Sequence, residues 1–448
     1  MKRLVCALLV LIALFGELAV VNNVHASTLV SGKLTSDVTW TLANSPYNFT
    51  GNVAVAAGVT LTIEPGVIVN FGTCNFDVNG TLIARGTSSD KIFFLTNSTN
   101  MYFSRQLSFT SFSSSWNEQT GQGCIIENAV LKSVTIVVNG GSPKIANNDL
   151  DYGIMIGGGS PIITNNNMVL ATSGINIMGG SPEISNNVIT GNGVSNGIYG
   201  TGNAIISKNT ISKFSTGIKI YSGTYQVTDN SITDCINGIE VATGATVTIQ
   251  RNLINNNKQY GISGGSPYVD SNTITNSRIG IHNPTAGVII NNNNILGHSE
   301  DSITAAQVDF DAVNNWWGTT DLAAINQTIY DKKIDPTLGK VSFVPFLSAP
   351  NPSAPAIPVI SFIPTLPPSR PTAPPTVAPT IQPSPTIKVT PIPTRDPNIP
   401  KTGANQTLSI FTLNVLVIAV FILLALVWVV VIAAYKVKKI FIKGNTTG

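Results

Sequence analysis

Few side chains in this sequence could perform acid–base chemistry. Of its 448 residues, 22 are Asp or Glu, 25 are Lys or Arg and three are His. Enzymes that cleave polysaccharides need two carboxylates at a defined separation, or acidic Ca²⁺ ligands beside a residue that abstracts a proton. Glu183 and Glu240 are weak candidates for such an acid and base, because no dense group of Asp, His, Lys and Arg accompanies them. The residues favour a non-catalytic protein, with a polysaccharide lyase or glycoside hydrolase as the alternative.

A polar surface that could bind sugar is the stronger chemical feature. Similar Gly-Ile-x segments recur along the chain, and their outward positions can be aligned as Met155, Asn176, Tyr199, Lys219, Glu240, Ser263 and His282. From this column we take Tyr199, Lys219, Glu240 and His282 as candidate ligand-binding residues. The alternative is that Lys219 and Glu240 form only a cross-strand ion pair, worth a few tenths of a kcal/mol.

We predict no metal site and no cofactor. Pairs of carboxylates at two-residue spacing could hold a cation, but we interpret them as solvated surface groups. Copper sites need clusters of Met, Cys or His, and the sequence offers only scattered pairs. The pairs in question are Asp149 with Asp151, Asp309 with Asp311, His282 with His298, and Met155 with Met178.

A regular repeat of asparagine predicts the scaffold that positions these groups. Ten asparagines recur at intervals of 18 to 22 residues, each in the frame apolar-x-x-Asn-x-apolar. They are Asn128, Asn148, Asn166, Asn187, Asn209, Asn230, Asn252, Asn272, Asn293 and Asn315. A period near 21 residues is too short for pairs of helices and fits one turn of a solenoid. We expect these side chains to stack as a ladder of amides at a sharp corner, where Asn tolerates the left-handed conformation.

Short strands fill each repeat. Apolar residues alternate in steps of two, which places side chains on opposite faces of a strand, and Gly-Gly-Ser-Pro or Asn-Asn turns separate the strands. The second residue after each repeated asparagine is apolar, from Val130 and Leu150 to Trp317, and is expected in the core. The fold class is therefore all-β, a parallel β-helix whose stacked turns are about 4.8 Å apart.

Several blocks resemble a known family. The pattern Gly-Gly-Ser-Pro-x-Ile-x-Asn-Asn-x-Ile recurs at 140–150, 158–168, 179–189 and, more loosely, 264–274. Residues 58–71 with 78–87, and 314–325 through 344–347, resemble the opening and closing segments of the same family. These blocks resemble the right-handed parallel β-helix repeat proteins of cell surfaces, in the pectate-lyase-like and NosD-like superfamily. The resemblance implies a right-handed helix and leaves the activity open.

The predicted domain boundaries follow from this pattern. We expect an N-terminal cap and first coils at 27–123, repeats at 124–315 and a C-terminal cap at 316–348. Residues 1–26 combine Lys2 and Arg3, an apolar run and a small-residue site ending at Ala26, which is typical of a cleaved signal peptide. An uncleaved anchor is the alternative.

The last hundred residues predict a surface tether. Residues 349–407 form a Pro- and Thr-rich stalk, 408–435 form a transmembrane helix, and 436–448 form a basic tail that stays inside the cell. Ile399-Pro-Lys-Thr-Gly403 resembles the sorting signal of sortase substrates. Anchoring to the wall and retention in the membrane are both open, and either places the N-terminus outside the cell.

Composition limits the partners. Charged residues make up 10% of the chain and the net charge is +3, so nothing attracts nucleic acid electrostatically. A disulfide between Cys74 and Cys124 is possible, but Cys235 leaves an odd count after signal removal. We predict a glycan-binding or adhesion module whose partners are extracellular polysaccharide or neighbouring surface components. A structural surface-layer component is the third hypothesis.

Overall fold

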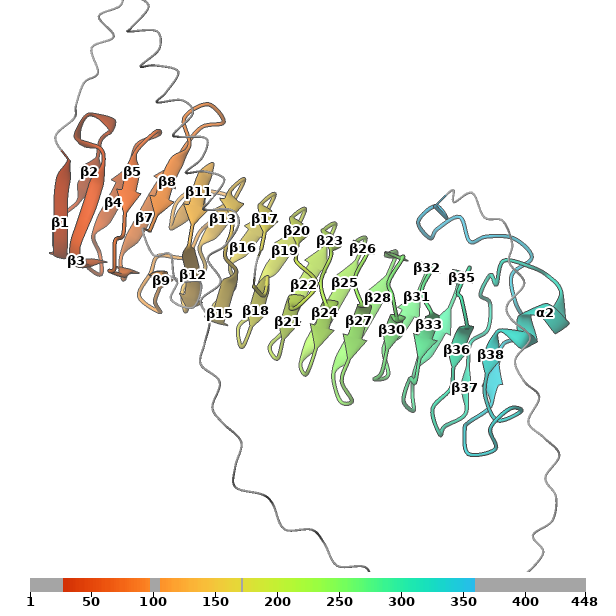
Figure 1. Cartoon of the computed structure of the whole chain (residues 1–448). Helices are drawn as coiled ribbons and strands as arrows, with labels where there is room; N and C mark the ends of the chain where they lie inside the picture. Colours follow the sequence, from red (N-terminus) through yellow and green to blue (C-terminus); the bar gives the residue numbers. More distant parts are fainter. Residues whose placement is uncertain (1–26, 97–104, 171, 359–448) are drawn as a thin grey trace, which may run out of the picture. The chain divides into compact units, whose positions relative to one another are not determined.

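The computed structural model describes residues 27–96, 105–170 and 172–358, which form one elongated solenoid (Figure 1). The solenoid is a right-handed parallel β-helix of about 13 turns. Each turn contributes one short strand to each of three parallel ladders, which we call sheets one, two and three. The predicted fold class is confirmed for the described residues.

Sheet one is a separate 12-stranded sheet. Its strands are β2 (Val38–Trp40), β4 (Thr60–Ile63), β7 (Thr81–Arg85), β10 (Ile125–Glu127), β13 (Lys144–Ala146), β16 (Ile162–Thr164), β19 (Glu183–Ser185), β22 (Ala204–Ser207), β25 (Thr224–Thr228), β28 (Thr246–Gln250), β31 (Tyr268–Asp270) and β34 (Ile289–Asn291).

Sheets two and three join at the N-terminal end, because β3 (Tyr47–Val55) pairs with β1 (Thr28–Leu34) and with the first strand of each. Sheet two continues through β5 (Ile68–Asn70), β8 (Ile92–Leu95), β11 (Ala129–Lys132), β14 (Asp149–Leu150), β17 (Asn167–Val169), β20 (Val188–Thr190), β23 (Thr210–Ser212), β26 (Ser231–Thr233), β29 (Leu253–Asn255), β32 (Thr273–Thr275) and β35 (Asn294–Leu296). Sheet three contains β6 (Phe76–Val78), β9 (Arg105–Phe109), β12 (Val134–Asn139), β15 (Ile154–Gly158), β18 (Ile175–Ile177), β21 (Asn196–Gly200), β24 (Thr216–Ile220), β27 (Asn237–Val241), β30 (Tyr260–Ser263), β33 (Ile279–His282), β36 (Asp301–Thr304) and β38 (Ile329–Tyr330).

Branched apolar side chains fill the interior of the rod. In sheet one, Ile184, Ile206 and Ile249 come from separate turns and are each 0% exposed. Burial of one such side chain contributes roughly 1.5–3 kcal/mol, so a column of them offsets the entropy lost in ordering short strands. The strands are stable only as a stack, because each buries its apolar face against its neighbours.

The first corner, between sheets one and two, contains the asparagine ladder. From Asn148 to Asn315 the ladder residues are at most 2% exposed. The Asn209 backbone N–H and side-chain amide both donate to Asn230 Oδ1, at 2.9 and 3.0 Å, and the same pair of bonds repeats along the stack. The buried side-chain amides thereby provide hydrogen-bond partners for one another and for the backbone groups at this corner.

Two expectations about this corner are wrong. Asn128 is not a ladder residue: the chain is displaced by one position there, so Ala129 donates its N–H to Asn148 Oδ1 at 2.8 Å and Leu131, not Val130, enters the core. The left-handed residue is also not the ladder asparagine. It is the residue before it, with φ of 52° to 59° in nine turns from Asn147 to Asn314. The ladder side chain can point inward because its neighbour makes the bend.

A column of glycines lies where sheet three begins in seven successive turns, from Gly153 to Gly280. A Cβ added to Gly217, Gly238 or Gly261 would lie 2.4 to 2.6 Å from a neighbouring carbonyl oxygen or isoleucine methyl group. Adjacent turns therefore approach more closely here than any side chain permits. This contact explains the recurring Gly-Ile pair in the sequence.

The two ends of the rod differ. At the C-terminal end, β38 pairs with β36, β37 (Phe310–Asp311) pairs with β39 (Val341–Ser342), and α2 (Leu322–Gln327) follows the N-cap Asp321. Trp317 is 5% exposed and packs edge-on against Phe343. At the other end, β1 and β2 are edge strands, followed by the 3₁₀ turn η1 (Leu42–Asn44).

Several predictions concern residues outside the described ranges. The signal peptide, the sortase-like motif, the transmembrane helix, the basic tail and most of the stalk all lie there. Within the described ranges, no helix is long and apolar enough to span a membrane. The three cysteines that are described, Cys74, Cys124 and Cys235, are free thiols, so Cys74 and Cys124 form no disulfide in this structure.

Candidate functional site

The outward column of sheet three follows the predicted register. Each of the seven sheet-three strands from β15 to β33 contributes one residue, and consecutive residues of the column are strand partners. The residues are Met155, Asn176, Tyr199, Lys219, Glu240, Ser263 and His282. Lys219 Nζ lies 2.8 Å from Glu240 Oε1, with each side chain about one-third exposed. At that exposure the pair contributes at most about 1 kcal/mol, so it organises the surface more than it stabilises the fold.

The four candidate ligand-binding residues do not form one continuous patch in the structure. Tyr199, Lys219 and Glu240 lie on three successive turns, whereas Ser263 separates Glu240 from His282. His282 instead stacks on Tyr260, with ring centroids 4.2 Å apart and an interplanar angle of 7°. The structure thus divides the predicted patch, and Tyr260 is a neighbour that the sequence did not identify.

Arg278 completes a cluster around Tyr260. Its guanidinium carbon lies 5.6 Å from the Tyr260 ring centroid, and its Nη1 bonds Glu300 Oε2 at 2.9 Å. Burial, with a smaller contribution from the Arg278 charge, lowers the pKa of His282. The imidazole is therefore neutral near pH 7, and its buried Nδ1 has no hydrogen-bond partner. Together, the side chains of Tyr260, His282 and Arg278 form a flat, partly polar surface.

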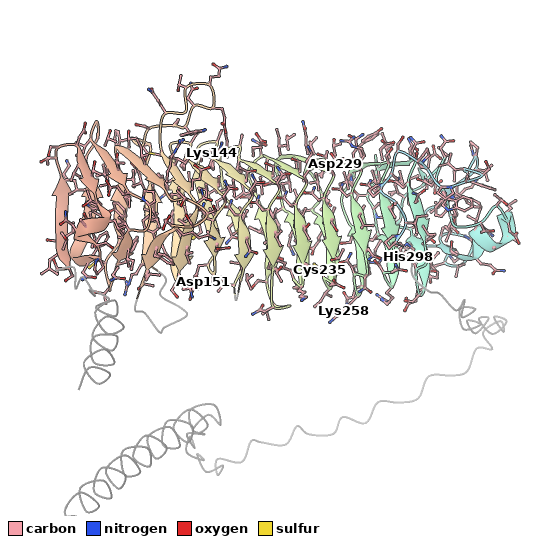
Figure 2. All side chains as sticks on the ribbon, turned by 90° about the horizontal axis from the view of Figure 1, so that it is seen from above. Lys144, Asp151, Asp229, Cys235, Lys258 and His298 are labelled. Atoms are coloured by element: carbon pink, nitrogen blue, oxygen red, sulfur yellow. The ribbon has the colours of Figure 1, made fainter. Side chains whose placement is uncertain are left out.

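A groove of about 390 Å³ lies beside this cluster, over the second corner between sheets two and three. Amides, hydroxyls, two cations and one carboxylate line it. The lining residues are Asp234, Asn256, Asn257, Lys258, Asn276, Ser277, Arg278, Gly297 and Ser299. Asp234 is held by Asn256, whose Nδ2 donates to Asp234 Oδ1 at 2.6 Å. Figure 2 shows Lys258 on the same long edge of the rod as Cys235 and His298.

The inner wall of the groove is a short second ladder. Cys235 donates its N–H to Asn257 Oδ1 at 3.0 Å, and Ser277 donates its N–H to His298 Nδ1 at 3.4 Å. Burial lowers the pKa of His298 to about 4, so its ring is neutral and can accept this bond. Unlike the first corner, this column leaves buried atoms without a partner.

Ser277 is the clearest of these unpartnered groups. It is 3% exposed, its Oγ forms no hydrogen bond, and it lines the groove. Asn276 Oδ1 and His298 Nε2 are also buried and without partners. A buried hydroxyl left unpaired costs about 1–3 kcal/mol, which a polar ligand in the groove can recover.

The two weak catalytic candidates lie on different faces. Glu183 is exposed on sheet one between Ile162 and Ile205, and Glu240 is on sheet three, two turns further along the rod. Two turns alone separate them by about 10 Å, which is beyond the spacing of paired glycosidase carboxylates. They do not form one acid–base pair.

Three of the four carboxylates in the remaining acidic pairs have structural partners. Asp149 pairs with Lys91, Asp151 accepts the Ser133 N–H at 2.7 Å, and Asp309 accepts the Lys340 N–H at 2.7 Å. Among the described residues, no group of three or more His, Cys, Asp or Glu side chains could hold a metal ion.

Sequence reasoning missed the groove, although the repeat contains a signal for it. Asp234, Asn256, Asn276 and Gly297 each lie four residues after a ladder asparagine, and all four have positive φ. They mark the second corner as clearly as the ladder marks the first. The alternating pattern concerns strand positions only, so it predicted no surface made of the turn residues between strands.

The comparison with known families agrees with this architecture. Residues 134–279 match the family model for a right handed beta helix region. The solenoid is a right-handed β-helix. The match covers most of the groove, whose lining begins at Asp234 and ends at Ser299. No curated protein and no solved structure matches this chain.

Proposed function

We propose that this β-helix binds carbohydrate without cleaving it, at the second-corner groove and the adjoining Tyr260 cluster. The observation that carries the proposal is Ser277, whose buried and unpartnered Oγ lines a groove of otherwise polar groups. Sugar hydroxyls both donate and accept hydrogen bonds, and the groove offers both functions through amides, a hydroxyl and a carboxylate. Lys258 and Arg278 add donors at its rim.

A flat polar surface beside the groove supports an extended ligand. Tyr260 and His282 form a stacked pair next to Arg278, and Lys219 with Glu240 continues the polar column on earlier turns. Successive turns are about 4.8 Å apart, so this surface repeats its donors at a spacing that a polymer can follow. The predicted secretion and surface tether would expose the rod to extracellular polysaccharide.

The carboxylates near the groove support binding more than catalysis. Asp234 accepts bonds from Asn256 and Thr233, and Glu300 is paired with Arg278. Both carboxylates are thus engaged by hydrogen-bond donors of the protein, which favours a role in shaping the groove over a role as general acid. An extracellular lyase or hydrolase and a surface-layer component are the other two functions that the test must separate.

The test uses the full-length protein and a panel of purified polysaccharides. Binding is measured by calorimetry, and glycan length is measured by size exclusion before and after incubation. We expect an intact glycan that binds, with affinity reduced roughly tenfold (about 1.4 kcal/mol) by Lys258→Ala or Ser277→Ala. Lys132→Ala and Ser212→Ala, outside the groove, are the matched controls and should bind normally.

Each alternative gives a different result. A glycan that becomes shorter contradicts the non-catalytic assignment. Binding that is equal in all four variants removes the groove as the site. Assembly into particles larger than a dimer, with no glycan binding, transfers the assignment to a structural surface-layer protein.

A further inference from the structure

The first turn of the rod is incomplete on its outer side. Val30, Leu34 and Val38 occupy the inward register positions of Phe49, Val55 and Leu61 on the next turn. Those three partners are at most 8% exposed, whereas Val30, Leu34 and Val38 are only partly buried against the core. The hydrophobic core therefore reaches the end of the described rod without a covering layer.

The edge strands at this end are open as well. Within the described residues, β1 pairs only with β3, and β2 pairs only with β4. The outer backbone N–H and C=O groups of such strands are a template for another strand. Strand β1 is seven residues long, Lys33 is its single charged residue, and Leu29 is 68% exposed. Figure 1 shows β1 at the end of the rod opposite α2.

On the N-terminal side of β1, removal of the predicted signal peptide leaves little of the chain to cover this surface. Cleavage after Ala26 makes Ser27 the first residue of the secreted protein, and β1 begins at Thr28. Such a cleaved chain has only Ser27 ahead of the edge strand. The C-terminal end contrasts with this, because α2, β38 and the buried Trp317 close the core there.

We propose that two copies of this protein associate end to end through their first turns. Each β1 pairs antiparallel with β1 of the other copy across a two-fold axis, and the partly buried Val30, Leu34 and Val38 of both copies complete a shared core. Because the same surface is used on both sides, the contact closes on itself and gives a dimer rather than a fibre. The interface is independent of the groove and of its ligand.

The dimer predicts a specific sensitivity at Leu34. In a single rod, a lysine at this position can extend its ammonium past the open end into water. In the dimer, the same ammonium is enclosed by the second copy and must lose its hydration. Leu34→Lys should thus weaken association while leaving the rod folded. Leu322→Lys, on α2 at the capped end, changes a leucine that is 54% exposed and serves as the control.

The experiment uses the full-length protein isolated from the cell surface of its own host, with its first residue identified by N-terminal sequencing. Mass is measured by light scattering over a concentration series, and the maximum dimension by small-angle scattering. We expect a dimer with about twice the rod length, a dissociation constant raised roughly tenfold or more by Leu34→Lys, and no change with Leu322→Lys.

Three results would overturn the proposal. A wild-type protein that stays monomeric at every concentration removes the dimer. A dimer that survives Leu34→Lys, with an unchanged circular dichroism spectrum as evidence of folding, places the interface elsewhere. A monomer whose first residue precedes Ser27 assigns the surface to residues 1–26 of the same chain instead.

Discussion

The first and second corners of the rod are built from similar turns but have different chemistry. Both bend at a residue with positive φ, and both turn a side chain inward just after it. At the first corner that side chain is asparagine in nine turns, from Asn148 to Asn315, and every amide except the last has partners in the turns before and after it. At the second corner the positions include Cys235, Asn257, Ser277 and His298, and the chain of bonds is interrupted.

This difference separates a structural corner from one that can bind a ligand. A complete ladder has no free donor or acceptor, so it contributes stability and offers nothing to a solute. An interrupted ladder retains unpaired groups next to a 390 Å³ groove. We therefore expect substitutions at the first corner to affect stability most, and substitutions at the second corner to affect pH response and binding.

The largest effect should come from breaking the complete ladder. Asn230→Ala removes the acceptor of two bonds from Asn209 and the donor to Asn252 Oδ1, all at 2.9–3.0 Å and all buried. The groups left unpaired should lower the free energy of unfolding by about 4 kcal/mol, as measured by urea denaturation. Asn139→Ala, at an exposed position, should change it by less than about 0.5 kcal/mol. Equal effects of the two changes would contradict a structural role for the ladder.

The second-largest effect should be a pH dependence of the free energy of unfolding that arises from His298 at the second corner. Burial holds the pKa of His298 at about 4, below its ordinary value near 6.5 in the unfolded chain. Between these values the unfolded state binds more protons, so stability is full above pH 6.5 and falls as the pH drops toward 4. The loss should reach about 3 kcal/mol at most, and less where the ring contacts solvent.

His298→Gln tests this assignment, because an amide oxygen can accept the Ser277 N–H without titrating. The stability difference between the two proteins should grow as the pH falls through that window. The carboxylates contribute equally to both proteins and cancel in the comparison. A difference that is independent of pH would assign the response to other groups.

A smaller loss is expected at the amide of the second corner. Asn257→Ala removes the acceptor of the Cys235 N–H and a longer bond, at 3.3 Å, to the Ile232 carbonyl oxygen. One strong bond and one weak bond should contribute about 2 kcal/mol, half the effect expected for Asn230→Ala. Thermal melts of the two variants, recorded side by side, give the ratio. A second-corner loss that equals the first would remove the distinction between the corners.

The smallest expected effect is a gain in stability. Ser277→Asn supplies an amide that can accept the Asn257 N–H, as Asn257 accepts that of Cys235. The repaired column should be more stable by about 1 kcal/mol. The same side chain occupies the groove, so carbohydrate affinity should fall. A variant that is stabilised and still binds normally would show that the missing amide is not what creates the site.

Most of the scaffold could be predicted because its packing and hydrogen bonding repeat at fixed intervals along the sequence. Spacings of about 21 residues and of two residues determine which side chains stack and which face inward, so the column through Lys219 and Glu240 was predicted in its correct register. The prediction was wrong at Asn128, where a one-residue displacement leaves the local pattern intact while Ala129 takes the ladder position. Spacing alone does not reveal such a shift.

The groove could not be predicted in the same way. Its lining comes from turns, and the alternation of a strand gives no information about where turn side chains point. Tyr260 stacks on His282 from the strand of the preceding turn, a contact that depends on side-chain rotation. In the sequence, only the Asp, Asn and Gly residues four positions after the ladder, such as Asp234 and Asn256, indicate a second corner.

The direction of the ladder bonds has a mechanical consequence. Backbone and amide hydrogen bonds between turns run along the rod axis, so a pulling force on the ends of the rod loads one layer of bonds after another. Each turn is held to the next by its three strand pairs and one amide contact. Under tension such a rod should lengthen by the detachment of single turns, and each detachment should release about 21 residues of slack. A rod built this way would absorb sudden strain in steps while the remaining turns stay folded.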